Sequence, residues 1–345
     1  MFPDAQRYLE VTEFRRPRVA LIFTGGTIDS VGTDRLDLAW YIEAGKRLDD
    51  HELVNAVPEL QGIADVTEVP FRRLPSQSIK DRDLFDLVEL IHRLVDEDKM
   101  DGVVITHGTN TLEETALFLH LTVKRDRPVV VVGAMRPASA ISADGYLNLL
   151  NAVRVAASPA AVGKGVLTVL NDTIHSARDV TKTATYRVDT FQGRDLGPLG
   201  YADNDGRVLF YHQPVRPHTT ATEFDVTGLH ALPRVDVVVS YLGADGVMID
   251  AAVGAGAKGI ISAGTGAGRP TPAEDAALDK ASAAGVAIIQ GTRVGSGRTV
   301  QSPGLKKKGW AGADNLQPWK ARILLALALT KTSDITEIQR IFDTY

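Results

Sequence analysis

Short runs of β-branched residues alternate with amphipathic stretches over most of the chain, and this alternation restricts the possible folds most. Four apolar runs are predicted strands, at 18–23, 103–106, 128–134 and 165–171. Between them, apolar residues spaced three or four apart predict helices over 83–95, 111–124 and 142–157. Parallel strands need crossover helices, so this order predicts an α/β fold with a large, doubly wound, mostly parallel sheet.

The alternation lapses and then resumes, which predicts a second domain. Glycine and proline accumulate between residues 188 and 225, and a linker is expected over 197–224. Strands are then expected at 235–241, 259–263 and 286–290, with helices at 244–256, 271–284 and 318–330. The expected organisation is an N-terminal extension over 1–17, a large domain over 18–196, the linker, and a smaller C-terminal α/β domain over 225–345.

Composition excludes several classes of chemistry. The chain has no cysteine, so an enzyme of this sequence must use an oxygen or an amine as nucleophile. A net charge of -5 without a long basic stretch argues against nucleic acid as a partner. The eight histidines form no H-E-x-x-H motif, and 264–269 lacks the third glycine of a dinucleotide loop, so neither a metal nor another cofactor is expected.

Hydropathy predicts a cytoplasmic protein that does not cross a membrane. No apolar run approaches the ~20 residues that a membrane-spanning helix needs. Residues 1–18 mix charged and apolar side chains and contain no signal-peptide hydrophobic region.

Two glycine–threonine turns follow predicted strands of the large sheet. One contains Gly26 and Thr27, and the other contains Gly108 and Thr109. Ligands of doubly wound sheets bind beyond the carboxyl ends of the strands, where both turns are expected. A threonine hydroxyl there acts either as a nucleophile or as a helix cap, and turn chemistry alone leaves both roles open.

Five ordered motifs carry a resemblance to a known family. They are Thr24-Gly25-Gly26-Thr27-Ile28, the run from Ile105 to Thr115, Gly133-Ala134-Met135-Arg136-Pro137, Ser142-Ala143-Asp144-Gly145, and Asn171-Asp172-Thr173 continuing to Arg178-Asp179-Val180-Thr181-Lys182-Thr183. From about residue 19 to 345 the chain resembles bacterial L-asparaginases of the asparaginase/glutaminase family. The resemblance implies a threonine amidohydrolase whose catalytic residues belong to the N-terminal domain.

The resemblance also implies roles for individual residues. Thr27 corresponds to the nucleophile, Thr109 to the second active-site threonine, and Lys182 to the lysine that acts with Thr109. Ser76 and Gln77 match the pair that holds the substrate α-carboxylate. In this mechanism Thr27 attacks an amide, ammonia leaves, and water releases the acid from the acyl-enzyme. A neutral Lys182 would accept the Thr27 proton through Thr109 or a water molecule.

The loop after Ile28 should carry the mobile tyrosine that helps to activate the nucleophile in the family. Tyr41 is the tyrosine available there, although Trp40 competes in a simple alignment. Backbone N–H groups at the turns of Gly26 and Gly108 are candidates for the oxyanion hole.

Two departures from the family concern the substrate amine. The family usually has aspartate where this chain has Asn110, and no acid occurs at 302–305, where the neighbouring subunit of an intimate dimer would supply a second acidic contact. Lys306, Lys307 and Lys308 follow instead. An amide accepts a hydrogen bond but lacks the charge that strengthens a contact with an ammonium group.

Three functions therefore remain open. The chain is an ordinary asparaginase with a tolerated asparagine, a hydrolase of another amide, imide or lactone that lacks a free α-ammonium, or a noncatalytic ligand sensor. Retention of Thr27, Thr109 and Lys182 argues against the sensor. The resemblance implies a homotetramer built as a dimer of dimers, or a homodimer, acting on a small-molecule amide.

Overall fold

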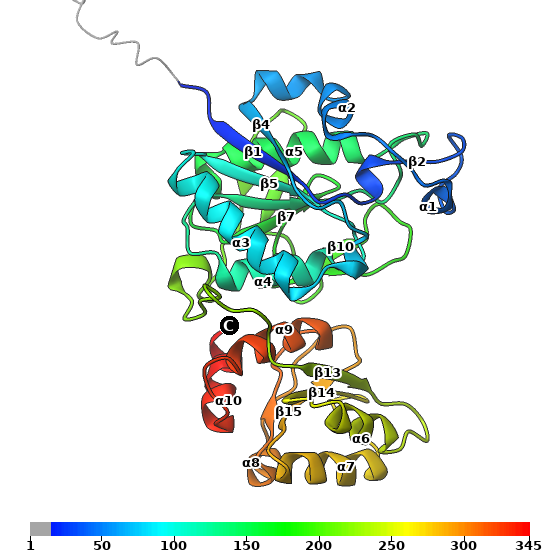
Figure 1. Ribbon diagram of the computed structural model, residues 1–345, viewed down its shortest axis with the longest axis vertical. Helices are drawn as coiled ribbons and strands as arrows, with labels where there is room; N and C mark the ends of the chain where they lie inside the picture. The colour runs from blue at the N-terminus through cyan, green and yellow to red at the C-terminus, as the bar shows by residue number, and fades with distance from the viewer. Residues whose placement is uncertain (1–14) are drawn as a thin grey trace, which may run out of the picture.

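A computed structural model describes residues 15–345, which form two α/β units, one above the other in Figure 1. Residues 1–14 of the expected N-terminal extension lie outside the described part. The large sheet has eight strands in the order β12-β11-β8-β7-β6-β5-β1-β4. They are β1 (Arg18–Phe23), β4 (Asp65–Pro70), β5 (Gly102–Thr106), β6 (Val129–Val132), β7 (Val166–Leu170), β8 (Thr173–Ser176), β11 (Gly200–Ala202) and β12 (Val208–Phe210).

The sheet from β4 to β7 is parallel, and β8, β11 and β12 add an antiparallel edge. Helices cover both faces of the sheet. Successive residues of a strand point to opposite faces, so each strand contributes side chains to both helix layers. In β1, Ala20 and Ile22 pack on the side of α3 (Asp81–Asp96) and α4 (Leu112–Thr122), whereas Val19 and Leu21 pack on the side of α5 (Gly145–Ala157). The unit also contains α1 (Tyr41–Ala44) and α2 (Asp50–Asn55).

Two short antiparallel strand pairs form sheets of their own. They are β2 (Ser30–Val31) with β3 (Lys46–Arg47), and β9 (Val180–Lys182) with β10 (Phe191–Gly193). The first pair closes the loop that carries α1, and the second ends at Lys182.

The C-terminal unit is a smaller parallel sheet in the order β13-β14-β15-β16. Its strands are β13 (Val235–Val239), β14 (Gly259–Gly264), β15 (Ala287–Thr292) and β16 (Ala311–Gly312), and its helices are α6 (Val247–Gly254), α7 (Pro272–Ala283), α8 (Pro303–Lys308), α9 (Pro318–Ala328) and α10 (Ile335–Thr344). The predicted fold class, a large mostly parallel sheet domain followed by a smaller α/β domain, is confirmed.

The expected linker contains strands of the large sheet. β11 pairs with β8 and β12 pairs with β11, although both lie within 197–224. Their pattern was hidden because each is only three residues long and the surrounding chain is rich in glycine. We therefore propose that the segment between the domains begins after Phe210 and ends before β13.

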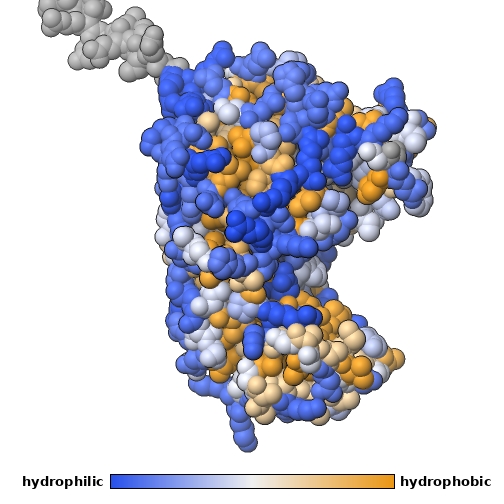
Figure 2. Space-filling view, viewed as in Figure 1, coloured by the Kyte–Doolittle hydropathy of each residue, from blue (hydrophilic) through white to orange (hydrophobic). Residues whose placement is uncertain are grey.

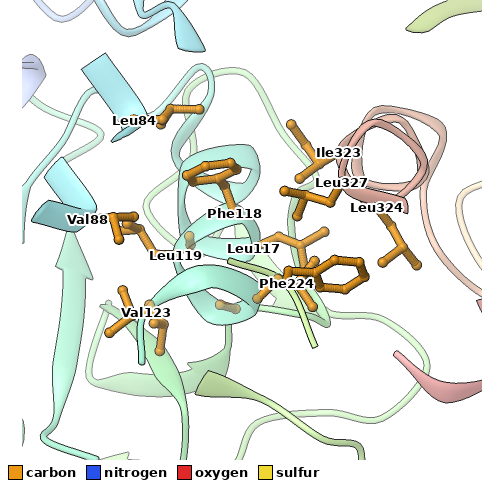
Figure 3. Close-up of a cluster of buried hydrophobic side chains, with 14 of the residues drawn as sticks. Leu84, Val88, Leu117, Phe118, Leu119, Val123, Phe224, Ile323, Leu324 and Leu327 are labelled. Atoms are coloured by element: carbon orange, nitrogen blue, oxygen red, sulfur yellow. The ribbon is translucent and has the colours of Figure 1, made fainter. Parts of the chain in front are cut away.

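Helices α4 and α9 join the two units. Leu117 and Phe118 of α4 face Ile323, Leu324 and Leu327 of α9 across an apolar contact (Figure 3). These side chains are at most 2 % exposed, so the helix contact belongs to a core that runs through both domains. Because α4 follows the turn of Thr109, this contact supports the helix that leaves the second glycine–threonine turn.

Within residues 15–345, every helix is too short or too polar to cross a membrane.

Candidate active site

The two glycine–threonine turns lie side by side at one edge of the large sheet. β1 and β5 are parallel neighbours, and Phe23 is paired with Thr106 at their carboxyl ends. The Thr24 hydroxyl donates to the Thr106 carbonyl oxygen at 2.7 Å, which joins the starts of both turns. From β1 the chain passes first to β4 on one side and later to β5 on the other. The turns therefore occupy the position where strand order reverses, as the sequence predicts.

Glycine is required in both turns because backbone segments approach closely. Gly26 has a φ of 129°, and a Cβ atom there would lie 2.8 Å from the Gly108 Cα atom. A Cβ atom on Gly108 would lie 2.9 Å from the Ser76 side chain. Three segments that are distant in sequence thus meet at van der Waals distance, and a larger side chain at either glycine would separate them.

A cavity of about 730 Å³ opens at this edge, and all nine predicted site residues line it. They are Gly26, Thr27, Tyr41, Ser76, Gln77, Gly108, Thr109, Asn110 and Lys182. A volume of this size suits a small-molecule ligand. The residues come from five separate segments of the N-terminal unit, so the fold has to be complete before the cavity exists.

Thr27 lies against the tyrosine of the loop that carries α1. The Thr27 Oγ1 and Tyr41 Oη atoms are 2.9 Å apart. Tyr41 is 9 % exposed, whereas the competing Trp40 is 70 % exposed. Burial raises the pKa of Tyr41, and the hydrogen bond with Thr27 opposes that effect. The Tyr41 side chain is therefore a protonated phenol at neutral pH, able to exchange a hydrogen bond with the Thr27 hydroxyl.

Lys182 approaches the second threonine. Its Nζ atom is 2.9 Å from Thr109 Oγ1 and 3.4 Å from Asn110 Oδ1. Burial lowers the pKa of Lys182, while the nearby Glu113 carboxylate opposes the shift. A lowered pKa makes the neutral amine, which is the form that accepts a proton, easier to reach.

Helix α4 supplies a buried carboxylate next to Lys182. Glu113 is 5 % exposed, and its Oε1 atom accepts a hydrogen bond of 3.1 Å from the Lys182 backbone N–H. Its Oε2 atom is buried and has no hydrogen-bond partner among the described residues. Glu113 thereby fixes the backbone of Lys182 and also opposes the loss of the lysine proton.

The segment that carries Ser76 and Gln77 faces Asn110 across the cavity. The Asn110 Nδ2 atom donates to Gln77 Oε1 at 3.3 Å, and the Thr111 hydroxyl donates to the Ser76 carbonyl oxygen at 2.8 Å. Asn110 therefore bridges Gln77 and Lys182 through an uncharged amide. Its two polar ends are used as an amide would use them, with nitrogen donating and oxygen accepting.

The cavity also contains residues to which the sequence analysis gives no role, among them Arg47, Glu113 and Tyr186. Arg47 arrives from the β2–β3 pair, with its Nη1 atom 3.2 Å from Asp29 Oδ1. Glu113 lies within the motif from Ile105 to Thr115, whereas no local pattern marks Arg47 or Tyr186, because their positions depend on how distant loops cross the edge of the sheet.

The lysine run and the turn histidine do not line the cavity. Lys308 forms ion pairs with Asp275 and Asp279, and its Nζ atom lies 4.5 Å from the Trp310 ring centre. His107 is fully buried, with Nδ1 2.8 Å from the Gly108 carbonyl oxygen. Burial lowers the pKa of His107 to about 4, so its ring is neutral at pH 7.

Among residues 15–345, no group of three or more histidine, aspartate or glutamate side chains is arranged to hold a metal ion.

Comparisons with known proteins cover nearly the whole chain. The family model "Asparaginase, N-terminal" matches residues 18–216, and "Glutaminase/Asparaginase C-terminal domain" matches residues 234–342. L-asparaginase 2 of Bacillus subtilis is 44 % identical over 329 residues, covering 95 % of this chain and 87 % of that protein. Glutaminase-asparaginase of Pseudomonas fluorescens is 41 % identical, covering 100 % of this chain and 95 % of that protein.

A solved structure has the same fold. It is that of a "probable cytoplasmic L-asparaginase" from Campylobacter jejuni, with a TM-score of 0.92 and 42 % identity over 96 % of this chain and all of that chain. The predicted resemblance is confirmed by both family models and by these relatives. The chain therefore belongs to the asparaginase/glutaminase family and is an asparaginase-like amidohydrolase.

Proposed function

We propose that the protein hydrolyses L-asparagine or a related carboxylate-bearing amide through an acyl-enzyme on Thr27. The observation that carries the proposal is the presence of two contacts in one cavity, Thr27 with Tyr41 and Thr109 with Lys182. A threonine hydroxyl is a weak nucleophile and needs a nearby base, and a lysine with a lowered pKa meets that need.

The reaction has two balanced steps. In the first, Thr27 Oγ1 attacks the amide carbon, its proton passes to Lys182 through Thr109 or a water molecule, and ammonia leaves after receiving a proton. In the second, water attacks the ester and frees the acid and the Thr27 hydroxyl. Backbone N–H groups at Gly26 and Gly108 are our candidates for stabilising the oxyanion in both steps. We assign Ser76 and Gln77 to the substrate α-carboxylate.

The experiment combines an adduct with a matched variant. Substrate added to purified protein and quenched rapidly should add the acyl mass to the peptide that contains Thr27, as seen by mass spectrometry. Thr27→Ala should remove both the adduct and turnover. Thr67→Ala, at an exposed position on β4 of the same domain, should retain both. Substrate turnover by Thr27→Ala at the wild-type rate would exclude Thr27 as the nucleophile.

Asn110 favours a second candidate substrate class, namely amides that have the carboxylate but no free α-ammonium. The Asn110 amide is uncharged, and it lies between Gln77 and Lys182. Kinetics with L-asparagine, L-glutamine, succinamate and N-acyl asparagine distinguish the candidates. High efficiency on L-asparagine alone would exclude the second one.

We also propose a homotetramer or homodimer. Apolar side chains are exposed on the C-terminal unit along β13, the loop after it and α6, where Figure 2 shows a concentration of hydrophobic surface. They are Val239, Tyr241, Leu242, Val247 and Met248, each more than half exposed. Contiguous surface of this kind is typical of protein interfaces. Light scattering coupled to gel filtration tests the assembly, and a monomer at all concentrations would contradict it.

The cytoplasm is the proposed location. One relative is named a "probable cytoplasmic L-asparaginase", while another, from Haemophilus influenzae, is named "probable L-asparaginase periplasmic". Fractionation of cells that produce the untagged protein decides between the two compartments.

A further inference from the structure

Lys320 is a fully buried charged residue that the proposed reaction does not use. It lies on α9 in the C-terminal unit and is 1 % exposed. An ammonium group is costly to remove from water unless its donors are satisfied inside the protein. A buried lysine on a helix with an otherwise apolar inner face therefore needs a specific reason.

The Lys320 ammonium has three donors and contacts three backbone carbonyl oxygens. Those of Ala177 and Arg178 are each 2.9 Å away, and that of Val180 completes the set. All three belong to the chain that leaves β8 and enters β9 in the N-terminal unit. One side chain from the C-terminal unit thus fixes the backbone that leads to Lys182.

Helix α9 also supports Thr109, the other partner in the contact with Lys182. Its apolar residues pack on α4, the helix that begins directly after Thr109 (Figure 3). The Thr109–Lys182 contact is therefore supported on both sides by one helix. Apolar packing fixes the threonine side, and the Lys320 ammonium fixes the lysine side.

Charge connects the two lysines through Glu113. The charged groups around the Lys320 ammonium are Glu113 and Glu114 on α4 and Arg178 and Asp179 before β9. Burial lowers the pKa of Lys320 to about 8, and Glu113 is the strongest opposing charge. The same Glu113 opposes the burial that lowers the pKa of Lys182, and it accepts a hydrogen bond from the Lys182 backbone N–H. A positive charge at Lys320 therefore offsets the carboxylate that favours protonation of Lys182.

We propose that Lys320 is a positioning residue for the amide hydrolysis, which holds the chain before β9 so that Lys182 Nζ meets Thr109. The inference rests on the proposed function, because it gives Lys182 a part in the chemistry. Displacement of a reacting group by about 1 Å costs roughly 100-fold in rate. All nine predicted site residues lie in the N-terminal unit, and the C-terminal unit adds Trp319, the residue before Lys320, to the lining of the cavity.

The test compares three lysine-to-methionine variants. Methionine keeps most of the length of the side chain and removes the three donors and the charge. Lys320→Met should lower kcat roughly 10- to 100-fold and change KM less than about threefold, because substrate-holding residues are untouched. In the pH profile of kcat/KM for this variant, the acid limb should move to higher pH, because the pKa of Lys182 rises when the Lys320 charge is lost. Hydrogen exchange should accelerate at residues 180–182.

Lys124→Met is the matched control. The Lys124 ammonium also contacts backbone carbonyls, those of Thr219 and Thr222, but it does not line the cavity. Its removal should lower stability without changing kcat or the pH profile. Folded Lys320→Met with the kcat, pH profile and exchange of the wild type would overturn the inference.

Two further variants keep the outcome decisive. If Lys320→Met does not fold, Lys320→Arg replaces it, because a planar guanidinium keeps the charge but its N–H groups do not converge on three carbonyls. Lys320→Arg should keep the acid limb and lose at least about threefold in kcat, and an unchanged kcat would overturn the inference. Lys182→Met reports on the proposed function separately. If Lys182→Met is fully active, the proposed function fails, whereas an inactive Lys182→Met beside a fully active Lys320 variant refutes only the positioning role.

Discussion

Asn110 is the residue at which we expect one charge to decide between the two candidate substrate classes. Its amide nitrogen donates to Gln77, and its oxygen lies 3.4 Å from Lys182 Nζ. A carboxylate at this position would keep the second contact, but it has no hydrogen to donate to Gln77 Oε1, so the Gln77 amide would have to turn its nitrogen toward it. It would also add a negative charge beside Lys182.

Asn110→Asp should therefore change specificity and pH dependence together. A charge-assisted contact to an ammonium group is worth about 1.5–3 kcal/mol, so kcat/KM for L-asparagine should rise relative to succinamate by roughly 10- to 100-fold. The added charge raises the pKa of Lys182, so the acid limb should move to higher pH. Steady-state kinetics from pH 5 to 9 measure both effects. If the ratio of substrates and the profile stay the same, position 110 does not discriminate.

The backbone conformation at position 26 requires glycine. Gly26→Ala places a side chain at a φ of 129° and within 2.8 Å of the Gly108 backbone. We expect a loss of about 1–3 kcal/mol in stability from the backbone conformation alone. Activity should fall at least about 10-fold because Thr27 moves with its turn. Gly62→Ala is the control, since its φ is not positive and no atom lies near the added carbon. Thermal unfolding and turnover of both variants test the prediction.

At the scale of elements, α9 determines how the two units fit together. Leu324 is fully buried in the core cluster that faces α4 (Figure 3). Leu324→Ala should cost about 2–5 kcal/mol of unfolding free energy, because it removes buried apolar contacts and leaves a cavity. Leu196→Ala, at a side chain that is 63 % exposed, should cost less than about 0.5 kcal/mol. Urea unfolding at fixed protein concentration measures both, and equal costs would contradict the packing described for α9.

Elements with a strong period could be predicted, and those without one could not. A short apolar run predicts the strand at 18–23, and apolar residues three or four apart predict the helix α3. The structure has both elements. The short strands β11 and β12 were missed because three residues show no period, and they are strands only because β11 pairs with β8 and β12 pairs with β11. The helix expected at 142–157 begins at Gly145, since Ser142 has a φ of 60° and forms part of a turn.

The candidate site was predictable to the extent that it lies in motifs. Thr27, Thr109 and Lys182 belong to such motifs, and they line one cavity. Lys320 was not predictable as part of the site, because its role depends on carbonyl groups about 140 residues away in sequence. Backbone acceptors are the same at every residue, so no side-chain pattern marks the place where a distant ammonium will bind.

At the scale of the whole molecule, buried neutral histidines link stability to pH. Burial lowers the pKa of His107 and His175 to about 4 and that of His120 to about 3. They come from the turn after β5, from β8 and from α4, so three separate elements of the large domain are involved. The unfolded chain binds these protons near pH 6.5.

The folded protein should therefore lose stability as pH falls from 6.5 toward 5. In this window the unfolded state binds more protons than the folded state, so each histidine contributes a slope of up to about 1.4 kcal/mol per pH unit. Urea unfolding at pH 7, 6 and 5 should show the loss. His120→Asn removes one of these titrating rings and should reduce the slope by up to that amount. The fold should tolerate it, because the Val166 N–H, which donates to His120 Nδ1 at 3.1 Å, can donate to the asparagine amide oxygen instead. Thr67→Ala, at an exposed position on β4, removes no titratable group and should leave the slope unchanged. Equal unfolding free energies at pH 5 and pH 7 in the wild type would mean that these rings are protonated in the fold, which their burial and the missing partner of His107 Nε2 argue against.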